Sequence, residues 1–147
     1  MNALNDQLMT LSALRASGIW AEGHEPTIRT LQSWAQESLI PWISHGRRRL
    51  VVLAGIAKRL RVCLLWPNNV LQPPELVNPD ITALRLVRFH GLRSSGIWHL
   101  SALPCERVLR AMVERRQIPC YQISRMQFFC IGQVRHCLVD SRYVEAA

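Results

Sequence analysis

The chain has 147 residues, of which 49% are apolar, so it can build a packed core and is not intrinsically disordered. Its net charge of +8 favours a polyanionic partner, although a genome rich in arginine codons is an alternative explanation. Lys58 is the only lysine, so nearly all of the positive charge is arginine, which binds phosphate and guanine through two parallel hydrogen bonds.

The sequence predicts one module repeated twice, because the rare tetrapeptide Ser-Gly-Ile-Trp occurs at 17–20 and again at 95–98. The same offset of 78 residues gives twelve identities in 34 aligned positions, which include Leu14-Arg15, Pro26, Leu31, Ile40-Pro41 and Arg47. We call residues 4–65 the first module and residues 82–142 the second module. Because a unit of about 60 residues is marginal alone, we expect the modules to pack on each other or on a partner.

The first expected element of each module is an amphipathic helix that ends at the glycine of the repeated tetrapeptide. Apolar residues three or four positions apart predict this helix in the first module, namely Leu4, Leu8, Leu11 and Leu14. In the second module Leu84, Val87, Leu92 and nearby apolar residues lie in the same register. We expect Ile19 and Trp20, which follow Gly18, to enter the core.

A second helix is expected to begin near Pro26 and near Pro104, because proline is favoured in a first helical turn. Its inward residues are predicted to be Ile28, Leu31 and Trp34, and in the second module Val108, Leu109 and Met112. Ile-Pro then leads into two short strands, and a third helix is expected near 54–65 and 133–143. Gly46 supplies the hairpin turn of the first module. The second module has no glycine there, so we expect its hairpin to bend differently.

Residues 67–80, PNNVLQPPELVNPD, are rich in proline and asparagine and predict an extended, semi-stiff linker. The chain is therefore divided into residues 1–66, the linker at 67–80, and residues 81–147. The expected fold class is mainly α with small β-hairpins, an α+β fold. Helix, turn, helix and hairpin follow one another in each half, which is the order of a winged helix-turn-helix, so two such modules are predicted in tandem.

One stretch resembles a known family. Residues 26–52, PTIRTLQSWAQESLIPWISHGRRRLVV, are similar to the winged-helix module of the MerR, phage excisionase and phage terminase small-subunit superfamily. The similarity lies in Ile28-Arg29-Thr30-Leu31, Trp34, Ile40-Pro41 and Gly46-Arg47-Arg48-Arg49. The sequence departs from the family at Ser38, where glycine is usual, and in the longer loop between its first two helices.

The resemblance implies that the second helix enters the major groove of DNA and that the hairpin, or wing, contacts the backbone or the minor groove. The residues that we expect to contact DNA in the first module are Thr27, Arg29, Thr30, Gln32 and Ser33 on the helix and His45, Arg47, Arg48 and Arg49 on the hairpin. In the second module they are Arg107, Arg110 and Arg125. The alternative for the helical residues is an ordinary solvated face.

The expected function is sequence-specific binding of double-stranded DNA, by a transcription regulator or recombination directionality factor of a phage or mobile element. A phage terminase small-subunit type of DNA recognition protein is one alternative. The other is a subunit or inhibitor in protein–protein assembly, because the apolar hairpin of the second module suits a homodimer contact or a protein partner. We expect no enzyme, since no catalytic motif is present.

The five cysteines are an odd number without a C-x-x-C pair, which argues against a disulfide framework. We expect Cys105, Cys120 and Cys130 to be buried or half-buried packing residues. A zinc site of Cys120, Cys130, His136 and Cys137 is the alternative, but its spacing fits no usual ligand pattern, so we expect no metal and no cofactor. The sequence has no signal peptide and no stretch of about 18 apolar residues, so we expect a cytoplasmic protein without a membrane partner.

Overall fold

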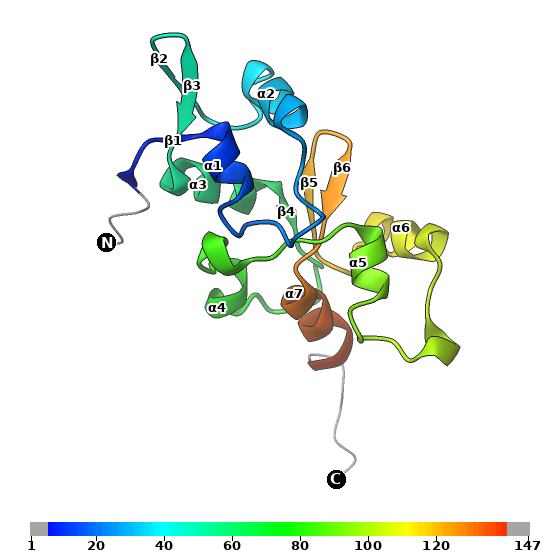
Figure 1. Ribbon diagram of the computed structural model, residues 1–147. Coiled ribbons are helices and arrows are strands. Elements are labelled where there is room, and N and C mark those ends of the chain that lie inside the picture. Colours follow the sequence, from blue (N-terminus) through cyan, green and yellow to red (C-terminus); the bar gives the residue numbers. More distant parts are fainter. Residues whose placement is uncertain (1–5, 141–147) are drawn as a thin grey trace.

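The computed structural model describes residues 6–140, which form a mixed helix-and-strand fold of the α+β class (Figure 1). The elements of the first module are β1 (Met9–Thr10), α1 (Leu11–Arg15), α2 (Ile28–Gln36), β2 (Ile43–His45), β3 (Arg48–Val51), α3 (Leu53–Cys63) and β4 (Leu64–Leu65). The short helix α4 (Pro74–Val77) follows. The second module contains η2 (Ile81–Ala83), α5 (Phe89–Arg93), η3 (Leu100–Ala102), α6 (Glu106–Glu114), β5 (Cys120–Ile123), β6 (Met126–Phe128), α7 (Ile131–Arg135) and the π-helical turn η4 (His136–Asp140).

The two modules repeat the same elements at the offset of 78 residues. Helices α2 and α6 begin and end at equivalent positions. The hairpins share their register, since Ile43 pairs with Leu50 as Tyr121 pairs with Phe128. Strand β1 pairs Met9 with Val51, and the corresponding bridge joins Val87 to Phe129.

Identical residues also make equivalent contacts in the two modules. Arg15 Nε donates to the carbonyl oxygen of Pro26 at 2.8 Å, and Arg93 Nε donates to that of Pro104 at 2.9 Å. Each bond ties the end of the first helix to the start of the second. The identities Arg15/Arg93 and Pro26/Pro104 of the repeat therefore have the same structural role in both modules.

The first helix of each module is shorter than expected. Helix α1 begins only at Leu11, because Thr10 caps it by accepting a hydrogen bond from the N–H of Ala13 at 3.1 Å. Leu8 precedes the helix and is exposed, and Leu4 lies outside the described residues. Leu84 and Val87 are buried but lie before α5 rather than within it. The apolar spacing that predicted one helix arises from a short extended segment followed by a helix.

The hairpin of the second module bends like that of the first, against expectation. Ser124 occupies the place of Gly46 and adopts the same left-handed backbone, with φ of 56° against 64°. The strands on both sides of Ser124 fix the turn, so a residue other than glycine tolerates this conformation.

Two further expectations of burial were wrong. Val108 was expected to point inward and is exposed, and Cys105 is exposed at the N-terminal end of α6. Cys120 is buried and Cys130 half-buried, as expected. The exposed positions correspond to Thr30 and Thr27, which lie on the outer face of α2, so the repeat itself explains both differences.

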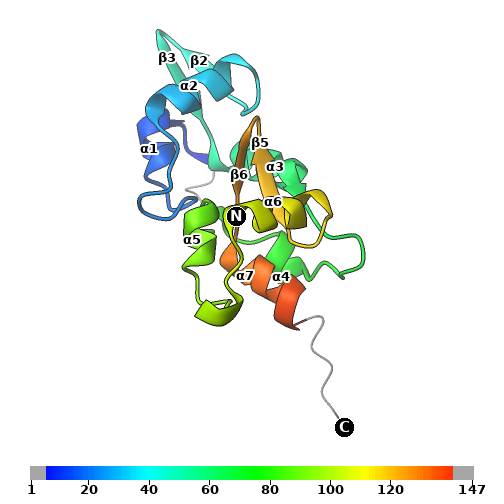
Figure 2. The same ribbon diagram turned by 90° about the vertical axis from the view of Figure 1, so that its right-hand side faces the viewer.

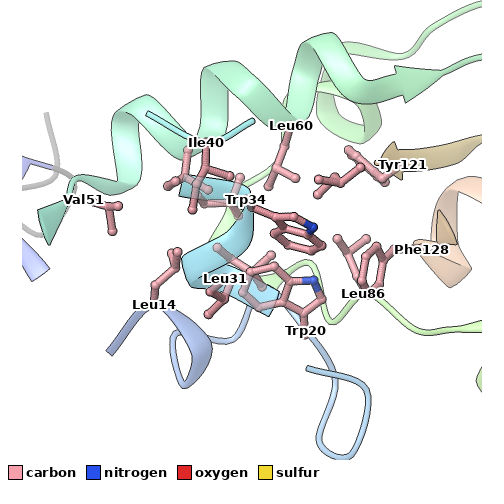
Figure 3. Close-up of a cluster of buried hydrophobic side chains, with 14 of the residues drawn as sticks. Leu14, Trp20, Leu31, Trp34, Ile40, Val51, Leu60, Leu86, Tyr121 and Phe128 are labelled. Carbon is pink, nitrogen blue, oxygen red and sulfur yellow. The ribbon is translucent and has the colours of Figure 1, made fainter. Parts of the chain in front are cut away.

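The modules pack on each other and share the larger of two buried apolar clusters (Figure 3), while the buried residues of the smaller cluster all belong to the second module. Trp20 and Trp34 of the first module meet Phe128 of the second, with ring centroids 6.3 and 6.2 Å apart. Strand β4 at the end of the first module pairs with β5 of the second, Leu64 with Tyr121. The apolar hairpin of the second module is therefore covered by the first module.

The linker is docked rather than extended. It contains α4, and the buried side chain of Gln133 donates from Nε2 to the carbonyl oxygen of Leu76 at 2.7 Å and to the hydroxyl of Tyr121 at 2.8 Å. Arg61 of the first module donates to Asn78 Oδ1 at 2.6 Å. These bonds fasten the linker to both modules.

Candidate nucleic-acid interface

Helix α2 presents a polar face above a buried apolar one. Thr27 caps the helix, since its Oγ1 accepts a hydrogen bond from the N–H of Thr30 at 3.1 Å, and the two hydroxyls lie 2.9 Å apart. Leu31 and Trp34 are buried and fix the helix on the core. The remaining predicted contact residues of the helix therefore point outward, and the exposed ones are Arg29, Gln32 and Ser33.

The hairpin β2–β3 carries the other predicted residues. His45 pairs with Arg48 at its end, so Gly46 and Arg47 form a two-residue loop whose first member has positive φ. Leu50 is buried and holds β3 on the core. His45, Arg47 and Arg48 are exposed near the tip, while Arg49 is half-buried and faces α2.

The helix and the hairpin lie side by side at one end of the molecule (Figures 1 and 2). A hollow of about 430 Å³ lies between them, lined by Thr10, Leu11, Ser12, Ile28, Gln32, Arg47, Arg48 and Arg49. Arg49 joins its two walls, because its Nη1 donates to the carbonyl oxygen of Gln32 at 3.4 Å while its guanidinium lies 5.0 Å from the ring centroid of Trp42. The fold thus brings Gln32 and the three consecutive arginines together.

This surface is strongly positive. No carboxylate lines the hollow, and residues 27–53 contain four arginines and a single acidic residue, Glu37. No acidic residue lies in the first turn of α2, so the partial positive charge of the helix N-terminus adds to that of the arginines. Such a surface attracts anions.

The chain matches no family model, no curated protein and no solved structure. Within residues 6–140, no helix is both long enough and apolar enough to cross a membrane. In the same part of the chain, no three His, Cys, Asp or Glu side chains gather as ligands for a metal ion. Burial raises the pKa of Cys120 to about 12 and also raises the pKa of Cys130.

The second module arranges its arginines differently. Arg110 donates from Nη2 to Glu106 at 2.6 Å and lies 4.6 Å above the ring of Phe89, so its guanidinium is already engaged. The hollow of about 590 Å³ on α6 is lined by Glu106, Arg107, Arg110, Ala111 and Glu114, which mixes both signs of charge. Arg125 is exposed at the hairpin tip. Arg107, Arg110 and Arg125 therefore form no surface comparable to that of the first module.

Sequence reasoning missed Ser12 and Trp42 as members of the candidate interface. Ser12 lies on α1 and reaches the hollow because β1 pairs with β3, an interaction between short strands far apart in the chain. Trp42 is exposed and carries the cation–π contact of Arg49. The one local signal in the sequence was a tryptophan, Trp42, five positions before the run of three arginines.

Proposed function

We propose that this chain binds double-stranded DNA through its first module, with α2 in the major groove and the hairpin β2–β3 on the phosphate backbone or in the minor groove. The observation that carries the proposal is the hollow whose walls bear Gln32 and Arg47, Arg48 and Arg49, without any carboxylate. The resemblance of residues 26–52 to winged-helix DNA-binding modules supports the same assignment.

The residues divide into two roles. Arg29 and Gln32 project from α2, where an arginine can read guanine and a glutamine can read adenine by paired hydrogen bonds. Arg47 and Arg48 at the hairpin tip suit phosphate oxygens, which position the protein without reading sequence. Arg49 holds the hairpin against α2 and so sets the distance between the two contacts. Ser33, and His45 beside the tip, are placed for further phosphate contacts.

The second module has a supporting role in this proposal. Its hairpin packs on α2 through Phe128 and Trp34, and so fixes the helix that reads the groove. Arg107 and Arg125 are exposed and add contacts that do not depend on sequence. The biological setting that we propose is a transcription regulator or recombination directionality factor of a phage or mobile element.

Fluorescence anisotropy with random-sequence duplex DNA tests the class of function. We expect binding that weakens between about 50 and 200 mM salt with a log–log slope of about −5 to −7, for about six to eight neutralised phosphates. Absence of binding at low salt would exclude the proposal. It would favour the assembly function, which the exposed apolar side chains of Leu8, Trp42 and Ile43 support.

A further inference from the structure

The first Ser-Gly-Ile-Trp segment forms the joint between the two modules. The carbonyl oxygen of Gly18 accepts a hydrogen bond from the N–H of Arg85 at 3.1 Å, and that of Ile19 accepts one from the N–H of Leu86 at 2.7 Å. Trp20 pairs with Leu86 as a parallel bridge. A Cβ atom on Gly18 would collide with the carbonyl group of Thr82, so the glycine is required for this close approach.

The second Ser-Gly-Ile-Trp segment has a similar backbone and packs only partly, with Ile97 and Trp98 against the buried cluster of its own module. Gly96 has φ of 87°, close to the 96° of Gly18, yet a Cβ atom on Gly96 would meet no described atom within 4 Å. Ile97 and Trp98 are half-buried, whereas Ile19 and Trp20 are buried. Residues 95–98 of the second module are therefore more accessible than residues 17–20, which the first module uses in the joint. We call residues 95–98 the tail.

The first module displays the other half of the same joint. Leu86, Cys120 and Tyr121 are buried, Leu86 and Tyr121 at the joint (Figure 3) and Cys120 opposite Leu65 of β4 in the same sheet, and their equivalents 78 residues earlier are exposed. These equivalents are Leu8, Trp42 and Ile43, whose exposed fractions are 48%, 37% and 51%. We call these three residues the head.

The outer edge of β2 belongs to the same surface. Within residues 6–140 that edge pairs with no strand, while the equivalent edge of β5 is paired with β4. Exposed edge strands and exposed apolar patches are both sites at which other chains add. The head thus offers unpaired backbone groups as well as apolar side chains.

We propose that a second molecule of this chain docks head to tail, so that the joint inside one molecule recurs between molecules. The tail of one molecule meets Leu8 of the next, as Ile19 and Trp20 meet Leu86 inside one molecule, and Trp42 and Ile43 lie beside that contact. Because Leu8 is the repeat equivalent of Leu86 and the tail is the repeat equivalent of residues 17–20, a second molecule is favoured over an unrelated partner. A contact between two different surfaces is heterologous, so it extends into a chain of molecules or closes into a ring. This proposal does not rest on DNA binding, although the head shares Trp42 with the candidate interface.

The test measures molecular mass by analytical ultracentrifugation of the full chain without nucleic acid, from about 1 µM to about 1 mM, where weak to moderate association becomes visible. The wild type is expected to exceed its monomer mass of 16.9 kDa increasingly with concentration. Leu8→Glu blocks the head, and Gly96→Asn blocks the tail with a residue that tolerates positive φ. Leu71→Glu is the matched control, because Leu71 is 89% exposed in the linker and has no equivalent in the joint.

Each blocked variant is expected to remain a monomer, and an equimolar mixture of the two is expected to form a dimer and nothing larger, since each retains one intact surface. Leu71→Glu should associate like the wild type. If Gly96→Asn does not fold, Ala102→Glu takes its place as the variant that blocks the tail. Ala102 is exposed and is the repeat equivalent of His24, which stacks on His90 across the joint. A monomeric wild type, blocked variants that still associate, or a mixture that stays monomeric would each overturn the proposal.

Discussion

The rings of Trp34 and Phe128 meet edge to face across the joint of the two modules, with centroids 6.2 Å apart and planes at 90°. Trp34 lies on α2, whose outer face carries the candidate DNA contacts, and Phe128 lies on β6 of the other module. Both rings are buried in one cluster. The geometry of the candidate interface therefore depends on the second module.

Phe128→Ala is expected to lower the free energy of unfolding by about 3–5 kcal/mol, because it opens a cavity at this contact. Urea denaturation followed by circular dichroism measures the loss. Val62→Ala serves as the control, since Val62 is exposed and its truncation should change stability by no more than about 0.5 kcal/mol. A loss below about 1 kcal/mol for Phe128→Ala would show that the modules do not depend on the shared core.

The cap of α2 gives a second prediction. Thr27→Ala removes the hydrogen bond to the N–H of Thr30 and is expected to cost about 0.5–2 kcal/mol of stability. The repeat provides the control: Cys105 occupies the same position of α6 and makes no side-chain cap bond, so Cys105→Ala should cost much less. Thermal unfolding of the two variants under identical conditions makes the comparison. Equal losses would contradict the capping role of Thr27.

A pH dependence is expected at the joint between the modules. His24 Nδ1 accepts a hydrogen bond from the N–H of Arg88 at 3.0 Å, and its ring stacks on His90 with centroids 4.2 Å apart. Burial, followed by the nearby His90, lowers the pKa of His24 below its ordinary value of 6.5. The unfolded chain then binds a proton at a higher pH than the folded chain does, so stability is lost as pH falls from 6.5 through the lowered pKa.

Urea midpoints measured across this pH range test that expectation. His24→Asn keeps an acceptor for the N–H of Arg88 but removes the titrating group, so its stability should fall less steeply between neutral and mildly acidic pH. Identical slopes for the wild type and His24→Asn would show that another group governs the dependence.

The repeat could be predicted from the sequence because its identical residues carry backbone geometry and helix contacts. Gly18 and Gly96 both need positive φ, and Arg15 and Arg93 both bond to the proline that begins the next helix. The arginines of the first hairpin could be predicted as a surface cluster for a similar reason. A run of three beside a turn glycine is a local signal.

The joint between the modules could not be predicted from local patterns. Strands β1 and β4 have two residues each, which is too short for any periodic pattern. Phe128 occupies the place in the second module that Leu50 occupies in the first. Its ring nevertheless packs on Trp34 of the first module, at the joint where β4 pairs with β5. The docking of the linker follows from the same long-range arrangement, because Gln133 and Arg61 bond to it from the two modules.

The binding of duplex DNA by two matched triple variants tests the central claim most directly. Replacement of Arg47, Arg48 and Arg49 by alanine, or of Arg107, Arg110 and Arg125 by alanine, lowers the net charge from +8 to +5 in both cases. Anisotropy titrations should show at least about a tenfold loss of affinity, about 1.4 kcal/mol, for the first variant. Its salt slope should become shallower by about 2, for the phosphate contacts of Arg47 and Arg48. The second variant should lose clearly less. Undiminished binding by the first variant, or equal losses in both, would contradict DNA binding through the first module.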